Sequence, residues 1–217
     1  MNTTTEQVAL EILGRLNAVL TNDHFVYTKG DHGSVYVNKD AIYPHTVETA
    51  RLCRLFADRF EFDDIQVVVG PEKGGIILSQ WTAHRLTDIT NINDVLAVYA
   101  EKDTTNDGTF IFARGYEKLI PGKRVLIVED VLTTGGSVKA VVQAVRALGG
   151  DIRGVAAICN RGGVTAAEIG DVPELYSLVD ITLDKWSAEK CPLCARDVPI
   201  NTARGKGKEF LARKNGG

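Results

Sequence analysis

The spacing of apolar residues changes period along the N-terminal part of the chain. Residues 8–20 repeat apolar side chains at helical spacing, which predicts a helix with one buried stripe. Two short apolar runs, 25–27 and 35–37, flank the polar, glycine-bearing loop 29–34 and predict a hairpin of two strands. A helical stripe returns over 44–60 behind a proline, so a second helix is expected there.

From residue 65 onward, short apolar runs alternate with amphipathic stretches. This succession predicts an α/β fold with a mainly parallel, twisted sheet flanked by helices on both faces. Strands are expected at 65–69, 95–99, 125–128 and 155–159, and helices at 74–86 and 138–148.

No linker or internal repeat divides the chain, so the sequence predicts one domain over residues 1–217. The N-terminal helix and hairpin, up to about residue 43, are expected to form a small hood on that domain. The basic, glycine-containing tail 203–217 is expected to fray.

Composition and charge exclude several classes of partner. The chain is 44% hydrophobic and 24% charged, as in ordinary globular proteins. Its net charge of −3 offers no basic field for nucleic acid. The polar N-terminus lacks a signal-peptide pattern, and no apolar stretch approaches membrane-spanning length. We therefore expect a cytoplasmic protein with no nucleic-acid or membrane partner.

The four cysteines divide into two kinds. Cys53 and Cys159 lie in apolar patterns and are expected to be buried thiols. Cys191 and Cys194 form C-P-L-C, which can be half of a zinc site, but no second C-x-x-C or nearby histidine pair supplies the other ligands. A zinc site shared across a dimer is one alternative. The preferred interpretation is a structural turn.

Candidate chemistry concentrates in residues 125–137, V-L-I-V-E-D-V-L-T-T-G-G-S. An apolar strand ends at Glu129 and Asp130, which places two carboxylates at the sheet edge where α/β proteins bind ligands. Glycines and a following helix N-terminus turn backbone N–H groups toward an anion, and hydroxyls add donors. The loop that predicts this phosphate cradle consists of Thr133, Thr134, Gly135, Gly136 and Ser137.

All thirteen positions resemble the phosphoribosyl pyrophosphate (PRPP) signature of type I phosphoribosyltransferases. The resemblance implies the type I phosphoribosyltransferase fold. It also implies that the acid pair contacts the ribose hydroxyls, with Asp130 counted as catalytic, and that the loop holds the 5-phosphate. The implied PRPP-binding set here is Glu129, Asp130, Val131, Leu132, Thr133, Thr134, Gly135, Gly136 and Ser137.

A second strand–loop–helix junction occupies residues 69–75, V-G-P-E-K-G-G. Its backbone N–H groups and Lys73 can receive a second phosphate group. Beside the first motif it resembles the family's pyrophosphate loop, so Lys73 and Gly74 join the implied PRPP-binding set. The resemblance also implies a non-proline cis peptide in this loop.

The polar segment 99–108 reads by itself as a surface hairpin. Its position matches the catalytic loop of orotate phosphoribosyltransferases, whose pattern is Arg-Lys-Glu-x-Lys-x-His-Gly. Aligned on the final glycine, Lys102 keeps the first lysine and is the implied catalytic cation. The family's arginine, second lysine and histidine are replaced by Glu101, Thr105 and Asp107. We therefore expect a weakened loop and low turnover.

The hood and one arginine carry the rest of the resemblance. Residues 25–38 are similar to the orotate family's substrate hood, and Arg161 follows the strand ending at Cys159, where that family has an arginine for the orotate carboxylate. The implied base-binding residues are Thr133, Arg161, Tyr36 and Val37. C-P-L-C also occurs near the end of many members.

The resemblance implies transfer of a phosphoribosyl group from PRPP to orotate, giving orotidine 5′-monophosphate and pyrophosphate. Mg²⁺ is the implied cofactor, held through PRPP oxygens and not directly by the protein. A homodimer that shares loop 101–108 across subunits is also implied. Two alternatives stay open: transfer to another base, or a non-catalytic regulator that binds PRPP or a nucleotide. A P-loop NTPase and a dinucleotide-binding enzyme are excluded, because their glycine motifs are absent from the sequence.

Overall fold

A computed structural model describes residues 4–90, 94–182 and 184–215, and the chain in it divides into two units. One unit holds Met1–Leu10 and Tyr43–Ile181, and the other holds Glu11–Ile42 and Thr182–Gly217. Helix α1 (Thr5–Arg15) spans the boundary between them. The segment predicted as a hood therefore folds with the C-terminal segment of the chain.

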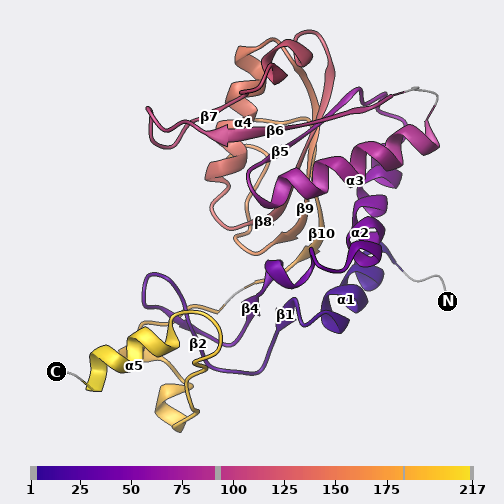
Figure 1. Ribbon diagram of the computed structural model, residues 1–217. Coiled ribbons are helices and arrows are strands. Elements are labelled where there is room, and N and C mark those ends of the chain that lie inside the picture. The colour runs from indigo at the N-terminus through magenta and orange to yellow at the C-terminus, as the bar shows by residue number, and fades with distance from the viewer. Residues whose placement is uncertain (1–3, 91–93, 183, 216–217) are drawn as a thin grey trace. The chain divides into compact units, whose positions relative to one another are not determined.

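A six-stranded sheet forms the centre of the first unit. Its strand order is β10-β9-β8-β5-β6-β7, and every neighbouring pair is parallel except β6 and β7 (Figure 1). The expected α/β fold with a mainly parallel sheet is confirmed. The strands are β5 (Val67–Pro71), β6 (Leu96–Lys102), β7 (Phe110–Ile111), β8 (Arg124–Leu132), β9 (Asp151–Asn160) and β10 (Leu175–Asp180).

Helices cover both faces of this sheet, because its strands are apolar on both sides. Alternate residues such as Val69 and Ile127 pack with α4 (Gly136–Ala147) in one core cluster. The residues between them face the other side, where α3 (Gly74–Ile89) contacts β5, β6 and β8. Helix α2 (Thr46–Arg59) packs in turn on α3, as Figure 1 shows.

Strand β8 is longer than the sequence predicts, and the acid pair lies inside it. The expected strand was 125–128, whereas β8 continues to Leu132 because β9 keeps pairing with it up to Leu132 and Asn160. Strand β5 pairs with β8 only as far as Ile127. Beyond Ile127, β8 is therefore paired on the β9 side and open on the side of β5.

The two strands that precede the candidate loops are neighbours at a reversal of the strand order. From β5 the chain proceeds outward to β6 and β7, and then crosses to β8 and continues outward the other way to β9 and β10. The loops after β5 and β8 consequently start side by side at a topological switch point, the place where α/β sheets bind ligands.

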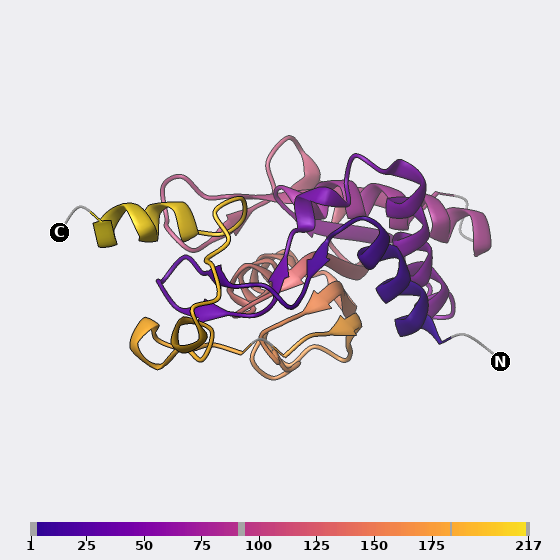
Figure 2. The ribbon, with the colours of Figure 1, turned by 90° about the horizontal axis from the view of Figure 1, so that it is seen from below.

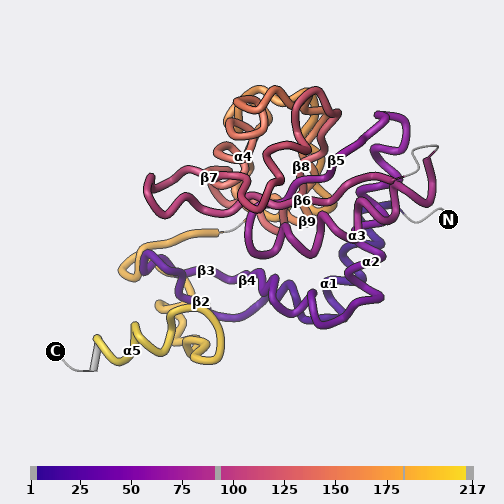
Figure 3. Tube along the Cα trace, turned by 45° about the horizontal axis from the view of Figure 1, so that its top comes forward, coloured from indigo at the N-terminus to yellow at the C-terminus, as the bar shows by residue number. Residues whose placement is uncertain are grey.

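The second unit contains two small antiparallel sheets and corrects two predictions. Helix α1 ends at Arg15 instead of residue 20, and β1 (Val19–Leu20) pairs with β4 (Tyr36–Val37). Strand β2 (Phe25–Val26) pairs with β3 (His32–Gly33), so the predicted hairpin partner of 25–27 was wrong (Figure 3).

The C-terminal segment runs beside the N-terminal hairpin within this unit, as Figure 2 shows. The tail for which the sequence predicts fraying contains helix α5 (Gly207–Asn215), which contacts β2.

Among the described residues, no helix is both long and apolar enough to cross a membrane. Single 3₁₀ turns are η1 (Lys39–Ala41), η2 (Tyr116–Leu119), η3 (Ala188–Lys190) and η4 (Cys194–Arg196).

Candidate phosphate-binding site

The loop after β8 forms a small cradle at the start of α4. Gly135 is the N-cap residue, and within the described chain no side chain caps this helix. The first N–H groups of a helix lack intrahelical partners, so they point out of the N-terminus and favour an anion. A pocket of about 120 Å³ lies there, lined by Glu129, Val131, Leu132, Thr133, Thr134, Gly135, Gly136, Ser137 and Val138.

Gly135 is required by the geometry of this turn. Its φ is +71°, a left-handed conformation that other residues rarely adopt. A Cβ at this position would also lie 2.6 Å from Ile169 Cγ2. The glycine therefore sets the direction in which α4 leaves the strand.

The acid pair divides between the two faces of the sheet, since successive strand residues point to opposite sides. Glu129 is 9% exposed and lines the cradle, and its Oε1 accepts the Asp130 backbone N–H at 2.9 Å. Asp130 is 2% exposed and points to the face covered by α3. The two carboxylates therefore serve two neighbouring parts of the site.

Asp130 is held in place by hydrogen bonds to both carboxylate oxygens. The Tyr43 hydroxyl donates to Oδ2 at 2.6 Å, and the Val131 backbone N–H donates to Oδ1 at 2.6 Å. Tyr43 comes from the segment just before α2, and nothing in the local sequence points to this role. The Asp130 carboxylate is thus prepositioned before any ligand binds.

The loop after β5 lies against Asp130. Its Glu72–Lys73 peptide is cis, as the resemblance implies. Helix α3 begins at Gly74, with Lys73 as its exposed N-cap residue. A Cβ on Gly74 would collide with the Asp130 carboxylate and the Tyr43 hydroxyl, so this loop approaches the acid because the residue is glycine.

Two helix N-termini, with carboxylates between them, therefore meet at one switch point. Each N-terminus carries a partial positive charge and a set of N–H donors suited to a phosphate group. Carboxylates accept hydrogen bonds from hydroxyl groups. The arrangement suits a ligand with two phosphate-bearing ends joined by a hydroxylated ring.

Arg161 lies at the same end of the sheet, next to the cradle. Its backbone N–H donates to Leu132 O at 3.0 Å, and its Nε donates to Thr133 Oγ1 at 2.9 Å. The preceding Asn160 closes the turn by exchanging two hydrogen bonds with the Val164 backbone. The structure thus brings Arg161 and Thr133, both predicted to bind the base, into direct contact.

The predicted catalytic loop is a hairpin stabilised by its own hydrogen bonds. Strand β6 runs to Lys102 and pairs with β7, so the hairpin expected from the sequence is present. Asp103 Oδ1 accepts the Thr105 hydroxyl and backbone N–H at 2.6 and 2.8 Å. Bonds from Thr105 lower the pKa of Asp103. The acid therefore organises an otherwise exposed loop.

Contacts at the base of this hairpin link it to the loop after β5. Glu72 Oε1 accepts the Lys102 backbone N–H at 3.1 Å, and the Glu72 N–H donates to Ala100 O at 2.9 Å. Glu101 forms an ion pair with Arg114 at 3.0 Å, which raises the pKa of Arg114. Arg114 lies outside the aligned loop, and the sequence interpretation missed that it offsets the charge of Glu101.

The remaining predicted base-binding residues belong to the second unit. Tyr36 and Val37 form β4 there, with Tyr36 half-buried and packed on Phe25 at a ring-centroid distance of 5.4 Å. Their role in binding a base stays a prediction from the resemblance.

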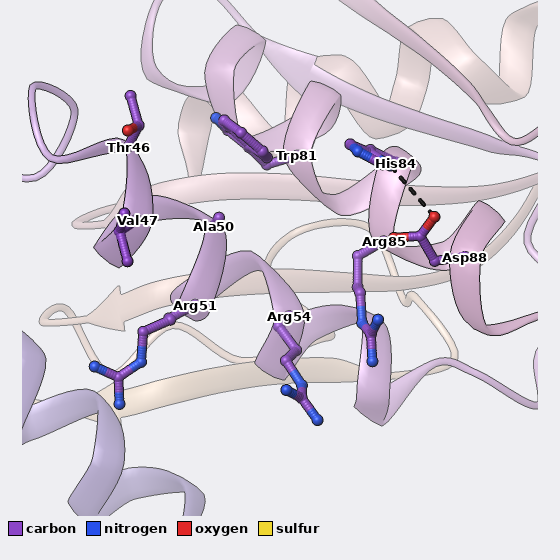
Figure 4. A pocket seen from close by; sticks show the side chains of 9 residues that line it. All are labelled: Thr46, Val47, Ala50, Arg51, Arg54, Trp81, His84, Arg85 and Asp88. Carbon is purple, nitrogen blue, oxygen red and sulfur yellow. Dashed lines mark ion pairs between the residues drawn. The ribbon is translucent and has the colours of Figure 1, made fainter.

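A larger pocket of about 430 Å³ lies on the outer surface of α2 and α3 (Figure 4). Its lining includes Trp81 and the arginines Arg51, Arg54 and Arg85. The lining contains none of the described site residues named above. The pocket also lies away from the loops after β5 and β8. Size alone therefore does not identify the site.

A family model and a curated relative assign this chain to the same protein family. The model of the phosphoribosyl transferase domain matches residues 39–190. The orotate phosphoribosyltransferase of Caldanaerobacter subterraneus is 34% identical over 195 residues, which cover 90% of this chain and 95% of that protein.

This chain shares its fold with solved structures of phosphoribosyltransferases named for two different bases. The orotate phosphoribosyltransferase of Mycobacterium tuberculosis in complex with PRPP aligns with a TM-score of 0.59 and 24% identity, covering 82% of this chain and 96% of that one. The adenine phosphoribosyltransferase of Saccharomyces cerevisiae aligns with a TM-score of 0.61 and 19% identity, covering 79% of this chain and 98% of that one. At these identities the likeness establishes the fold alone.

Proposed function

Because this chain belongs to the phosphoribosyl transferase family, and within it to the orotate phosphoribosyltransferases, we propose that it transfers the phosphoribosyl group of PRPP to orotate. The products are orotidine 5′-monophosphate and pyrophosphate. The observation that carries the proposal is the pair of helix N-termini, α3 and α4, that flank Glu129 and Asp130 at the switch point.

PRPP fits this arrangement group by group. The 5-phosphate binds the cradle of residues 133–137 at the start of α4, and the pyrophosphate binds Lys73 and Gly74 at the start of α3. The ribose hydroxyls between them donate to Glu129 and Asp130, as the division of the two carboxylates between the two faces suggests.

In the reaction, the bond from ribose C1 to a pyrophosphate oxygen breaks, a bond from C1 to an orotate nitrogen forms, and the proton of that nitrogen leaves with the pyrophosphate or to water. Negative charge grows on the departing pyrophosphate, so N–H donors at α3, Lys73 and Lys102 stabilise the transition state. The chain supplies no covalent nucleophile in this scheme. Its contribution is to position two substrates and to stabilise charge.

Mg²⁺ is proposed as the cofactor. Oxygen atoms are its preferred ligands, and the proposed PRPP oxygens supply them, so that Glu129 and Asp130 remain available to the ribose hydroxyls. When bound through PRPP, the ion would neutralise part of the pyrophosphate charge. Lys73 and Lys102 then act on the remaining charge.

Arg161 is proposed to bind the orotate carboxylate. Guanidinium has five N–H donors, and one of them is used on Thr133, which fixes the side chain at the edge of the cradle. A planar fork of donors suits a carboxylate better than a single ammonium does. A base without a carboxylate gains nothing from this residue, so Arg161 favours orotate over uracil.

We propose a symmetric homodimer in which loop 101–108 of each subunit closes over the partner's site. Mixing two variants, Lys102→Ala and Asp130→Asn, tests this when the assay uses a PRPP concentration too low for Asp130→Asn alone to bind. If the loop is shared, a mixed dimer contains one site with both normal residues, and an equal mixture recovers about a quarter of wild-type activity. Native mass spectrometry, which separates the mixed dimer from the two homodimers by mass, confirms that the subunits have exchanged. No recovery after exchange would place the loop over its own subunit's site.

The activity itself is tested with purified protein, PRPP and Mg²⁺, offered orotate, uracil, adenine or hypoxanthine in turn. We expect pyrophosphate release with orotate and release at background level with the other bases. Asp130→Asn, assayed at low PRPP concentration, serves as the low-activity control, and Asp151→Asn, at an exposed acid at the start of β9, serves as the matched active control. Release with another base alone would change the substrate. PRPP binding without release from any base would indicate a regulator.

A further inference from the structure

Four metal-ligating side chains converge in the second unit. His24, His32, Cys191 and Cys194 each place one ligand atom so that all four atoms lie within 4.8 Å of one another. The two histidines and Cys191 are buried, and Cys194 is half-buried. Two ligands come from the N-terminal hairpin and two from the C-terminal segment, which are separated along the chain by Tyr43–Ile181 of the first unit.

The hairpin explains why the histidines lie together. Val26 pairs with His32 in the β2–β3 register, and His24 stands two residues before Val26. Residues two apart on a strand share a face, so His24 and His32 are diagonal neighbours on one side of the hairpin. His24 Nε2 and His32 Nδ1 are 2.8 Å apart.

The C-P-L-C segment presents its two sulfur atoms to the same point. Cys191 begins a tight turn in which the Ala195 N–H donates to Cys191 O at 3.1 Å, and Cys194 starts η4. Cys191 Sγ lies 3.6 Å from His24 Nε2. Cys194 Sγ lies 3.8 Å from His24 Nε2 and 3.4 Å from His32 Nδ1.

These separations fit one tetrahedral ion. With zinc–sulfur and zinc–nitrogen bonds of ordinary length, tetrahedral ligands place sulfur and nitrogen about 3.6 Å apart. The three sulfur–nitrogen distances lie close to that value. The two nitrogens, 2.8 Å apart, need to separate by about half an ångström, which a rotation of the imidazole rings allows.

A hydrogen bond on the far side of one imidazole prepares it for a metal. His24 Nδ1 lies 2.8 Å from Val198 O. A carbonyl oxygen only accepts, so Nδ1 carries the proton and Nε2 presents its lone pair to the cluster. Metal-binding histidines are commonly oriented by such a backbone carbonyl. His32 packs edge-on against Phe210 of α5, with ring centroids 4.8 Å apart.

We propose that His24, His32, Cys191 and Cys194 bind one Zn²⁺ ion. Two imidazoles and two thiolates are the donor set that zinc uses in structural sites, and four protein ligands close its coordination sphere. The ion is therefore structural and separate from the Mg²⁺ proposed with PRPP. It clamps the N-terminal hairpin to the C-terminal segment within the second unit.

The structure thereby revises the interpretation of C-P-L-C as a mere turn. The sequence near C-P-L-C holds only two of the four ligands. The missing pair stands more than a hundred and fifty residues earlier, on the hairpin.

Metal analysis of the purified full-length protein, in the absence of PRPP, tests the proposal. We expect about one zinc per chain, a content that persists through dialysis against a weak chelator. The double variant Cys191→Ser/Cys194→Ser should lose the zinc. The matched control is Cys53→Ala/Cys159→Ala, which removes the two cysteines of the first unit and should keep it. Burial raises the pKa of both of these thiols to about 12, as expected of inert core cysteines.

Cobalt substitution gives a readout independent of activity, and the wild-type spectrum does not depend on the folding of any variant. Wild-type protein stripped of zinc and loaded with Co²⁺ should show intense tetrahedral d–d bands and a thiolate charge-transfer band. His24→Ala should weaken the d–d bands while the charge-transfer band persists. Wild type with less than about a tenth of a zinc per chain, or with a Cys191–Cys194 disulfide by mass spectrometry, would overturn the proposal. So would cobalt spectra of an octahedral, oxygen-bound ion.

Discussion

The phosphate cradle at residues 129–137 and the loop at 101–108 belong to the same sheet but are built on different principles. The cradle depends on a strand paired with β9 and on a left-handed glycine, and the neighbouring Asp130 is buried to 2% exposure. The loop depends on the exposed Asp103 carboxylate and on the ion pair of Glu101 with Arg114. The first is fixed by the fold, and the second by a few replaceable polar groups.

From this difference we expect substrate binding and turnover to be separable in this protein. The cradle keeps every position of the PRPP signature, whereas the aligned loop keeps only Lys102 among the family's cations. We therefore expect firm PRPP binding with slow transfer. Changes in the two regions should affect different kinetic constants.

The largest effect should come from Lys102→Ala. Loss of the one aligned cation should lower kcat by about 10²- to 10³-fold, with little change in PRPP affinity. Steady-state kinetics with orotate measure this, and Lys118→Ala, at an exposed lysine of η2, is the matched control. A kcat insensitive to Lys102→Ala would show that the loop is aligned incorrectly.

Asp130→Asn tests the other region, residues 129–137, and should weaken PRPP binding. Removing a charged acceptor for a ribose hydroxyl costs about 1.5–3 kcal/mol, or about 10- to 100-fold in PRPP affinity. Calorimetric titration with PRPP measures the loss, with Asp151→Asn as control. Unchanged affinity in a folded variant would remove Asp130 from the binding site.

Arg161→Ala should change the choice of base without weakening the cradle. We expect the KM for orotate to rise about tenfold, because a charge-assisted bidentate contact is lost, while the KM for PRPP stays nearly constant. Arg153→Ala, at an exposed arginine of β9, is the control. Equal changes in both KM values would assign Arg161 a general role in folding.

Thr105→Lys should repair part of the loop. A second cation beside the departing pyrophosphate is expected to raise kcat several-fold, a modest gain because an exposed charge contributes only about 0.2–1 kcal/mol. Thr105→Gln, which removes the hydroxyl without adding charge, should give no gain. If both variants gain equally, the effect arises from loop mobility.

The smallest effect concerns pH. The pKa of Asp103 is lowered by hydrogen bonds from Thr105, so these bonds stabilise the loop above the ordinary aspartate pKa of about 3.9. Their contribution is lost as the pH falls through the lowered value. Amide chemical shifts of the loop, followed by NMR, should change below the ordinary range in wild type and nearer to it in Thr105→Gln. Identical midpoints would contradict this account of the loop.

Much of this organisation is predictable because apolar runs specify strands and glycines specify turns. The cradle was located from thirteen consecutive residues, and α2, α3 and α4 lie close to their predicted positions. The features that were not predicted depend on contacts with residues distant in the chain. The length of β8 depends on β9, the place of Asp130 depends on Tyr43, and Cys191 meets His24 only after folding.

Pairing errors in the second unit have the same origin. Residues 35–37 were predicted to pair with residues 25–27, but they pair with β1. Residues 19–20 of β1 were predicted to be helical, because they continue the apolar stripe of residues 8–20. Asn17 has a φ of +51°, a turn conformation that ends the helix early and that the apolar spacing does not reveal. Short strands in such a unit are selected by tertiary contacts, because their intrinsic preference is weak.

A crystal structure of the wild-type protein with PRPP and Mg²⁺ tests the central claim most directly. The account predicts the 5-phosphate at the N-terminus of α4 within residues 133–137, the pyrophosphate at Lys73 and Gly74, and the ribose hydroxyls on Glu129 and Asp130. Binding in the reverse orientation, or at the arginine-lined pocket of α2 and α3, would contradict it.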